Sequence, residues 1–457
     1  MNVGDYLVKD NQSIKDAMRR IDRHGRQVAF VVDRLGRLKG SVSDGDIRRA
    51  LLRGADINSP VSAIMHANPI VLTEKEQAHP TLAWHLVRRL QRLLPSARVI
   101  PAVDHCGVPT AILSCADLKP LDRRKAPRLA TVLRVLVVGG AGFLGSHLVR
   151  KLLAKGYRVR VLDLMMFGAD SLKGLEKNKG FELVKGDLRD ISRVATALDG
   201  VDAVVNLAAV VGDPACSATP EDAILTNYLA NKALAEACKY HQINRYIYAS
   251  TCSVYGMGKR RLDENAPLNP VSLYARSKIQ AEEGILSLED ANFSPTILRM
   301  ATLHGLSWRM RFDLVVNTMT MNAHRDRRIF VHGGGLQWRP LLHVSDAAEA
   351  FLRCLEAPLP RVKGEIFNVG AEKENYQIFR IADIVARGLP GAKIVHKGES
   401  ADARDYHVSF KKVQARLGFA PKKNVAASVL EIKRALTRKQ LRNLSDPNYY
   451  NAESQCP

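Results

Sequence analysis

The sequence lacks long apolar runs, paired cysteines and an abundance of aromatic side chains. No hydrophobic stretch approaches the roughly 18 residues of a membrane-spanning helix. The opening residues, MNVGDYLVKD, carry acidic groups where a signal peptide has a basic and then an apolar segment. The seven cysteines are scattered without a CxxC pair, which argues against a disulfide framework and a zinc ribbon. We therefore expect a cytoplasmic protein with no membrane or metal partner.

Acidic residues are also fewer than basic ones, 46 against 68, so the formal charge is +22. Such a surplus suits nucleic acid, yet no RNA- or DNA-binding motif accompanies it and aromatic residues make up only 6%. Anionic small molecules or a basic solvated surface explain the charge as well. We expect no nucleic-acid partner; strongly salt-dependent binding to a duplex would indicate the alternative.

At 457 residues the chain is long enough for two or more domains, and its first part contains a pattern twice. VGDYL at residues 3–7 begins the first copy, and VSAIM at residues 61–65 begins the second. Each is followed by a helix-like stretch, two apolar strand-like runs and a short element with a hydroxyl and an aspartate. The charged, proline-containing stretch after the second copy reads as a linker over residues 119–132.

The two short elements share one spacing, since Ser43 and Asp46 stand three apart, as do Ser114 and Asp117. A serine at a strand-to-helix junction caps the helix, and the helix N-terminus suits phosphate. The aspartate one turn later can accept both hydroxyls of a ribose. Helix capping without a ligand is the alternative. Residues 1–118 resemble a tandem CBS module, which implies a regulatory adenine nucleotide (AMP, ADP or ATP) held by these four residues.

Residues 132–164 read VLRVLVVGGAGFLGSHLVRKLLAKGYRVRVLDL and contain a G-x-x-G-x-x-G spacing. An apolar strand-like run enters the glycine turn, an amphipathic helix follows, and a second strand ends at Asp163. Gly139 permits the tight turn, Gly142 the close approach of a pyrophosphate, and Gly145 the packing of helix on strand. Asp163 is placed to hold the adenosine ribose hydroxyls and would repel the extra phosphate of NADP. The stretch therefore predicts NAD.

Strand-like and helix-like segments continue to alternate beyond this fingerprint, which predicts a doubly wound parallel sheet of the α/β class. With GDL at 186–188, NLAA at 206–209 and a Y-x-x-x-K motif, the chain resembles the extended short-chain dehydrogenase/reductase family, and within it the NAD-dependent nucleotide-sugar epimerases and dehydratases. The resemblance implies such a Rossmann and nucleotide-sugar-binding domain over residues 133–440, followed by a tail over residues 441–457. It also implies cofactor contacts from Phe143, Leu144, Asp187, Leu188, Ala208 and Asn227.

Thr251, Tyr274 and Lys278 can carry oxidation and reduction of a sugar hydroxyl. Tyr274 acts as the base, the Lys278 cation lowers its pKa and holds the nicotinamide ribose, and Thr251 orients the sugar oxygen. Family members that remove water typically carry Asp and Glu at the next two positions, where this chain has Cys252 and Ser253. We expect Cys252 to be a packing residue. The motif favours an epimerase that oxidises and re-reduces C4 through a keto intermediate.

Three alternatives stay open. A nucleotide-sugar 4-ketoreductase or dehydrogenase would use the same three side chains. A 4,6-dehydratase would need acidic residues that the motif does not contain. In a non-enzymatic nucleotide-sensing scaffold, Thr251, Tyr274 and Lys278 would have no catalytic role. Each enzyme reading takes a nucleoside diphosphate sugar as its substrate.

The resemblance also implies contacts to the nucleotide sugar. A guanidinium fork suits the diphosphate, which points to Arg339 and Arg404. The matching family positions add Ser253, Thr302 and Asn317. Because CBS pairs and this dehydrogenase class usually dimerise, we expect a homodimer or homotetramer.

Overall fold

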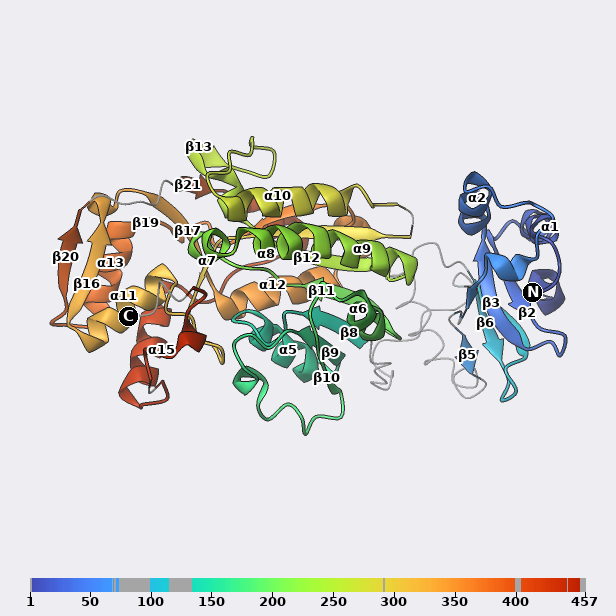
Figure 1. Cartoon of the computed structure of the whole chain (residues 1–457), viewed down its shortest axis with the longest axis horizontal. Coiled ribbons are helices and arrows are strands. Elements are labelled where there is room, and N and C mark those ends of the chain that lie inside the picture. Colours follow the sequence, from blue (N-terminus) through green and yellow to red (C-terminus); the bar gives the residue numbers. More distant parts are fainter. Residues whose placement is uncertain are drawn as a thin grey trace. The chain divides into compact units, whose positions relative to one another are not determined.

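The computed structural model describes residues 2–67, 69, 71–73, 99–114, 134–290, 292–398, 404–441 and 443–452. The chain divides into two compact units, Met1–Thr131 and Val132–Pro457 (Figure 1). Each unit has a hydrophobic core of its own. The predicted linker at 119–132 and the predicted ligand residue Asp117 lie outside the described residues.

The first unit contains a four-stranded sheet with the strand order β1-β2-β3-β4. The elements of this part are η1 (Val3–Tyr6), β1 (Leu7–Lys9), α1 (Ile14–His24), β2 (Val28–Val32), β3 (Leu38–Ser43), α2 (Asp44–Leu52), η2 (Val61–Ala63) and β4 (His66–Ala67). In α1, Ile14, Ala17 and Ile21 recur at helical spacing and are buried in one cluster with Val31 and Val42 of the sheet. The apolar face of the helix is thus what attaches it to the strands.

A second, three-stranded sheet in this unit repeats the strand pairing of the first. It consists of β5 (Leu72–Thr73), β6 (Val99–Val103) and β7 (Pro109–Ser114). In both sheets a short strand pairs parallel to the first strand of an antiparallel hairpin. Asp33 and Asp104 hold the two hairpin turns in the same way, each accepting backbone N–H bonds two and four residues further on. The internal repeat seen in the sequence is therefore also a repeat of backbone structure.

The second unit is built on a seven-stranded, wholly parallel sheet with the order β10-β9-β8-β11-β12-β14-β18. Its strands are β8 (Arg134–Val138), β9 (Arg158–Asp163), β10 (Phe181–Lys185), β11 (Ala203–Asn206), β12 (Arg245–Thr251), β14 (Ser294–Met300) and β18 (Ile366–Val369). The predicted doubly wound sheet is confirmed. Strand order reverses between β8 and β11, and such a switch point is where open α/β sheets bind ligands, at the carboxyl ends of the strands.

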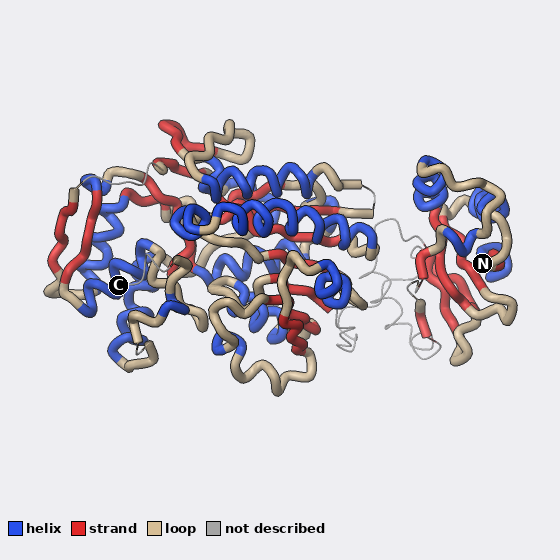
Figure 2. The backbone as a smooth tube through the Cα atoms, in the orientation of Figure 1, coloured by secondary structure: helices blue, strands red, loops and turns tan. Residues whose placement is uncertain are grey.

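Helices cover both faces of this sheet (Figure 2). They are α5 (Gly145–Ala154), α6 (Ile191–Leu198), α7 (Asp213–Ala218), α8 (Pro220–Ile224), the π-helix η4 (Leu225–Ala230), α9 (Asn231–Tyr240), α10 (Leu273–Leu286) and α12 (Val344–Glu356). Along β8, Val135 and Val137 join the core under α5 and α12, whereas Leu136 and Val138 join the core under α6, α9 and α10. The nearly continuous apolar sequence of β8 follows from this burial on both sides.

The remaining elements of this unit belong to smaller sheets, helices and helical turns. They are η3 (Asp170–Leu172), η5 (Cys252–Tyr255), β13 (Met257–Leu262), β15 (Thr302–His304), α11 (Val315–Arg325), β16 (Arg328–His332), η6 (Gly333–Gly335), β17 (Trp338–His343), η7 (Leu359–Arg361), β19 (Asn375–Gln377), α13 (Ile378–Gly388), β20 (Lys393–Lys397), β21 (Asp405–Val408), α14 (Lys411–Leu417), α15 (Val425–Thr437) and η8 (Pro447–Tyr449). Helix α11, α13 and α15 share one apolar core with β16. Within the described ranges, no helix combines the length and the apolar character needed to cross a bilayer.

A buried polar network joins the carboxyl ends of β12 and β14 to α10. Arg299 of β14 forms an ion pair with Glu282 of α10, with nitrogen–oxygen distances of 2.7 and 3.1 Å, and both side chains are almost fully buried. The same carboxylate accepts the hydroxyl of Ser250. Arg299 also donates to the Tyr255 hydroxyl at 3.0 Å, which in turn donates to Asn368 of β18 at 2.8 Å. The network fixes the position of α10 on the sheet.

We expect Arg299→Met to lower the free energy of unfolding by about 3–5 kcal/mol, because it leaves the buried Glu282 carboxylate without its partner. Adding Glu282→Gln should recover part of this loss, since an amide carries no charge. Urea unfolding followed by circular dichroism measures both. The control is Arg325→Met, which removes a half-exposed ion pair with Asp326 and should change stability by about 0.5 kcal/mol or less. If Arg299→Met were as stable as the control Arg325→Met, the buried ion pair would not make the contribution to stability that we assign to it.

Candidate active site

The glycine turn between β8 and α5 is packed against the loop that follows β11. Gly139 has a φ of 78°, and a Cβ atom on it would lie 3.0 Å from the backbone nitrogen of Ala208. A Cβ on Gly145, the first residue of α5, would lie 2.2 Å from the carbonyl oxygen of Gly139. The turn is thus a cradle that a side chain would fill, and it leaves the backbone N–H groups at the start of α5 facing the crevice at the switch point.

Asp163 ends β9 beside this turn. Its carboxylate accepts the backbone N–H groups of Ala141 and Met165 at 2.9 and 2.8 Å. Burial raises the pKa of Asp163, and these two hydrogen bonds oppose the rise. The guanidinium of Arg309 stacks on Phe167, 3.7 Å from the ring centroid, and its charge also lowers the pKa of Asp163. Asp163, which the sequence predicts to bind the adenosine ribose, therefore lines the crevice near the cationic Arg309, which the sequence motif did not indicate.

Other residues predicted to contact the cofactor divide between the cavity and its support. Asp187 lines the cavity and is paired with Arg189 at 2.7 Å. Asn227 is fully buried; its amide accepts the Val210 N–H at 2.8 Å and donates to the Val210 carbonyl at 2.9 Å and to Ser277 of α10 at 3.2 Å. Asn227 thus connects the loop after β11 to α10 and is not itself part of the cavity lining.

The structure brings Thr251, Tyr274 and Lys278 together at the carboxyl end of β12. Tyr274 lies in the first turn of α10, and Tyr274 and Thr251 line the same cavity. Burial raises the pKa of Tyr274, and the nearby Cys216 and Asp213 add to the rise, while Arg311 lowers it. The prediction that Lys278 lowers the Tyr274 pKa is not met in this structure, because burial outweighs it.

Lys278 is bound to residues other than Tyr274. Its ammonium donates to the hydroxyl of Tyr248 at 2.9 Å and to the carbonyl of Ala249 at 2.7 Å. Burial lowers the pKa of Lys278 to about 7, which Glu282 one turn further along α10 counteracts. The lysine is therefore poised between its charged and neutral forms near neutral pH.

The two positions after Thr251 carry no carboxylate. Cys252 is fully buried in the core and its thiol lies 3.2 Å from the Arg299 carbonyl oxygen, which confirms the expected packing role. Burial raises the pKa of this thiol, so it is uncharged at neutral pH. Ser253 lines the cavity, and its hydroxyl lies 3.2 Å from that of Tyr406.

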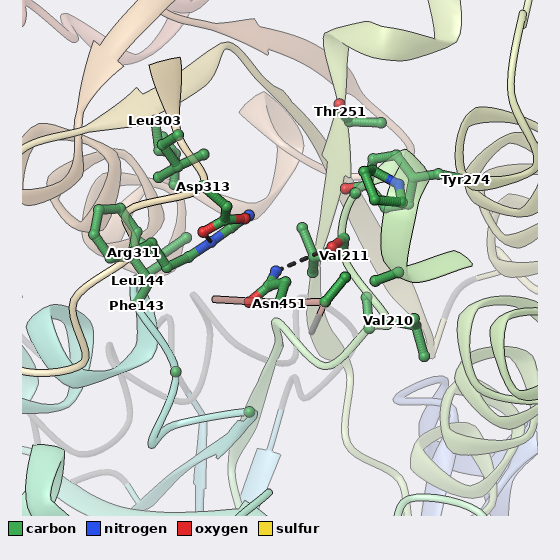
Figure 3. Close-up of a pocket in the computed structure, with 18 of the residues that line it drawn as sticks. Phe143, Leu144, Val210, Val211, Thr251, Tyr274, Leu303, Arg311, Asp313 and Asn451 are labelled. Carbon is green, nitrogen blue, oxygen red and sulfur yellow. Dashed lines mark hydrogen bonds and ion pairs between the residues drawn. The ribbon is translucent and has the colours of Figure 1, made fainter. Parts of the chain in front are cut away.

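A cavity of about 1320 Å³ extends from the glycine turn to residues predicted to bind the substrate. Figure 3 shows part of its lining, with Phe143 and Leu144 of the glycine turn and with Thr251 and Tyr274. Thr302, Arg339 and Arg404 line it. The guanidinium of Arg339 donates to the carbonyl oxygens of Trp338 and Arg404, and Arg404 forms an ion pair with Asp213 at 3.3 Å. The two predicted diphosphate ligands are thus linked to each other and belong to the same space as Tyr274.

Asn317 does not reach this space. It is fully buried in α11, where its amide accepts the Gly305 N–H at 2.9 Å and donates to the Arg311 carbonyl at 2.9 Å. The prediction that it contacts the nucleotide sugar needs correction, because both ends of the amide serve the backbone of the loop that carries Arg311. Asn317 positions a cavity residue instead of being one.

In the first unit, Ser43 and Asp46 form a capping box at the start of α2. One carboxylate oxygen of Asp46 accepts the N–H and the hydroxyl of Ser43 at 2.8 and 2.6 Å. The other oxygen accepts Arg49 and lies 2.9 Å from the His66 ring nitrogen. Burial would raise the pKa of Asp46, but the contacts with His66 and Ser43 lower it to about 2. Ser114 ends β7, the strand equivalent to β3.

Comparison with known proteins assigns parts of the chain to two families of domains. The model of the NAD dependent epimerase/dehydratase family matches residues 135–370. The chain belongs to this family. The CBS domain model matches residues 3–53, which contain Ser43 and Asp46.

Similar proteins include members of both branches of the epimerase/dehydratase family. The "uncharacterized UDP-glucose epimerase YtcB" of Bacillus subtilis is 29% identical over 262 residues, covering 55% of this chain and 81% of that protein. Human dTDP-D-glucose 4,6-dehydratase is 30% identical over 250 residues, covering 53% and 70%. The crystal structure of the dehydratase DesIV from Streptomyces venezuelae with NAD bound is 25% identical, with a TM-score of 0.61 and coverage of 67% and 98%. NAD is the cofactor of the present chain as well, and the glycine cradle together with Asp163 fits this dinucleotide.

Sequence reasoning missed several residues of the cavity, above all Asp213, Arg309 and Asn451. Asp213 follows the carboxyl end of β11 at the switch point, and this location was the one signal that could have pointed to it. Arg309 and Asn451 have no local signal, because only the tertiary fold brings them beside the crevice.

We expect Gly145→Ala to weaken NAD binding by about 100-fold, because its Cβ would meet backbone atoms of the glycine turn that must then move. Titration with NADH, followed by its fluorescence, measures the affinity. Gly398→Ala is the matched control, since a Cβ there meets nothing within 4 Å. Equal affinities for the two variants would contradict the assignment of the cradle.

Proposed function

We propose that the chain is an NAD-dependent nucleotide-sugar 4-epimerase. The observation that carries this proposal is the pair of residues after Thr251, where Cys252 is a buried neutral thiol and Ser253 a hydroxyl. Elimination of water from a sugar needs both an acid and a base beside the reacting carbons. Inversion at C4 needs only a group that takes up and returns one hydroxyl proton, and Thr251 with Tyr274 supplies it.

The side chains divide the work as follows. Tyr274 takes the proton of the 4-hydroxyl during oxidation and gives it back during reduction, while the hydroxyl of Thr251, which lines the same cavity, orients the sugar oxygen. The charged form of Lys278 would favour the phenolate, against the effect of burial on Tyr274. The chemistry that NAD supplies when bound is the uptake and return of a hydride at C4. Between the two steps the keto sugar turns within the cavity, so that the hydride returns to the opposite face of C4, and the sugar leaves with its composition unchanged and the C4 configuration inverted.

The substrate class rests on the basic end of the cavity and on the relatives. Arg339 and Arg404 offer planar guanidinium groups that match the oxygens of a diphosphate. Asp213 holds Arg404 at 3.3 Å, so an incoming diphosphate would share or replace this carboxylate. Because relatives are named for UDP-glucose and dTDP-glucose, both nucleotide sugars are the first substrates to test.

We expect incubation with UDP-glucose or dTDP-glucose to give a product of identical mass with the opposite configuration at C4. Proton NMR and mass spectrometry identify it. Tyr274→Phe should lower kcat by about 100-fold or more, because the proton acceptor is lost, while NADH still binds. Tyr240→Phe, at a tyrosine that is 83% exposed, is the matched control and should keep full activity.

A dehydratase is the second candidate, and Asp213 is the observation that favours it. This carboxylate lies close enough to Tyr274 to raise its pKa and lines the same cavity. It could therefore supply the acid that positions 252 and 253 lack. A product lighter by one water, and lost in Asp213→Asn, would replace the epimerase proposal with this one. A reduced or oxidised sugar formed only with added NADH or NAD would indicate a ketoreductase or dehydrogenase.

For the CBS domain we propose an adenine nucleotide as a regulatory ligand at Ser43 and Asp46. Asp46 is charged and its carboxylate already holds His66 and Arg49, so a ribose would have to displace at least one of these contacts. Release of His66, which belongs to β4 at the start of the second repeat, would carry the binding event from one repeat to the other.

We expect AMP, ADP or ATP to raise the thermal unfolding temperature of the full-length protein, and Asp46→Asn to weaken the binding about tenfold by removing a charged acceptor. Isothermal titration calorimetry measures the affinity. Asp44→Asn, two residues earlier on the exposed side of α2, is the control and should bind as the unchanged protein does. If none of the three nucleotides binds, the contacts of Asp46 are structural only.

A further inference from the structure

The C-terminal segment, residues 447–452, folds back onto the second unit beside the active-site cavity. The ring of Tyr449 packs edge-on against Phe312 with 5.6 Å between the centroids, and its carbonyl accepts the Phe312 N–H at 2.9 Å. Tyr450 is 3% exposed, and its carbonyl accepts Arg309 at 3.3 Å. The stretch expected to be a tail without chemistry is therefore anchored by two aromatic side chains and by backbone hydrogen bonds.

This anchoring carries Asn451 into the cavity. Its amide nitrogen donates to the carbonyl oxygen of Val211 at 3.0 Å, and Asn451 and Ala452 both belong to the lining. Figure 3 shows Asn451 near the middle of the view, with Phe143 and Leu144 of the glycine turn on one side and Val211 on the other. The segment thus reaches into the crevice from the C-terminal end of the chain.

The crevice beside Asn451 is the one expected to hold the dinucleotide. Its two walls are the loops after β8 and β11, which flank the switch point where such sheets bind nucleotides. With the segment in place the cavity still measures about 1320 Å³, more than the roughly 300–1,000 Å³ of ordinary ligand pockets. The segment therefore forms a wall of an open site and does not fill it.

We propose that Asn451 is a binding residue for NAD, and that the C-terminal segment slows release of the dinucleotide by closing the open side of its crevice. An asparagine amide has two N–H donors and one carbonyl acceptor, and the bond to Val211 engages one donor. The other groups are those that ribose hydroxyls, phosphates or a carboxamide can use. Slow release suits a reaction that regenerates its cofactor in every cycle, but the proposal concerns binding and holds for any member of the family that uses NAD.

The test measures how fast NADH leaves the full-length protein. Protein loaded with NADH is mixed with a large excess of NAD, and the loss of bound-NADH fluorescence gives the dissociation rate. Asn451→Ala should raise this rate by about fivefold, as expected for one lost hydrogen bond. Asn451→Asp should raise it further, because a carboxylate repels the pyrophosphate. Asn448→Ala, at an exposed asparagine of the same segment, should leave it unchanged.

Two results would overturn the proposal. Unchanged release in both Asn451 variants would make the contact with Val211 structural only, and slower release or tighter binding in Asn451→Ala would mean that the segment competes with the dinucleotide. Because both variants keep Tyr449 and Tyr450, the anchoring of the segment is retained, and equal thermal unfolding temperatures verify this. The measurement needs neither a sugar substrate nor turnover, so its outcome is independent of whether the enzyme is an epimerase.

Discussion

The ion pair between Glu282 and Arg299 sets the position of α10, the helix that carries Tyr274 and Lys278, on the sheet. A buried carboxylate and a buried guanidinium are far less stable apart than together, so α10 has one position in which both are satisfied. Tyr274, Lys278 and Glu282 are spaced four residues apart and share one face of that helix. Once Glu282 is fixed, the ammonium of Lys278 one turn earlier and the phenol of Tyr274 two turns earlier lie at the end of β12, near Thr251.

The cofactor end of the site follows from a different constraint, the close approach of two backbones. The glycine turn after β8 touches the loop after β11 so closely that a Cβ on Gly139 would press on Ala208. Between them these loops define the crevice, and Asp163 is held at its edge by backbone N–H groups. One end of the cavity is therefore shaped by glycines and the other by arginines, which matches a dinucleotide meeting a diphosphate sugar.

Much of this arrangement could be predicted because its signals are local. The glycine spacing, the strand ending at Asp163 and the four-residue interval from Tyr274 to Lys278 are all contained in short stretches of sequence. Asp213, Arg309 and Asn451 could not be found this way, since they come from loops and a terminus that only the tertiary fold brings together. Asn317 was misjudged for the same reason: its position near the substrate half was right, but the partners of its amide are set by the folded loop.

The amide of Asn227 has a mechanical consequence. It forms hydrogen bonds with the backbone of Val210 on one side and with the hydroxyl of Ser277, next to Lys278, on the other. These hydrogen bonds connect the loop that forms one wall of the crevice to α10, the helix that carries the phenol. A shift of this loop at Val210 would therefore pull on α10 and on the phenol of Tyr274 that it carries.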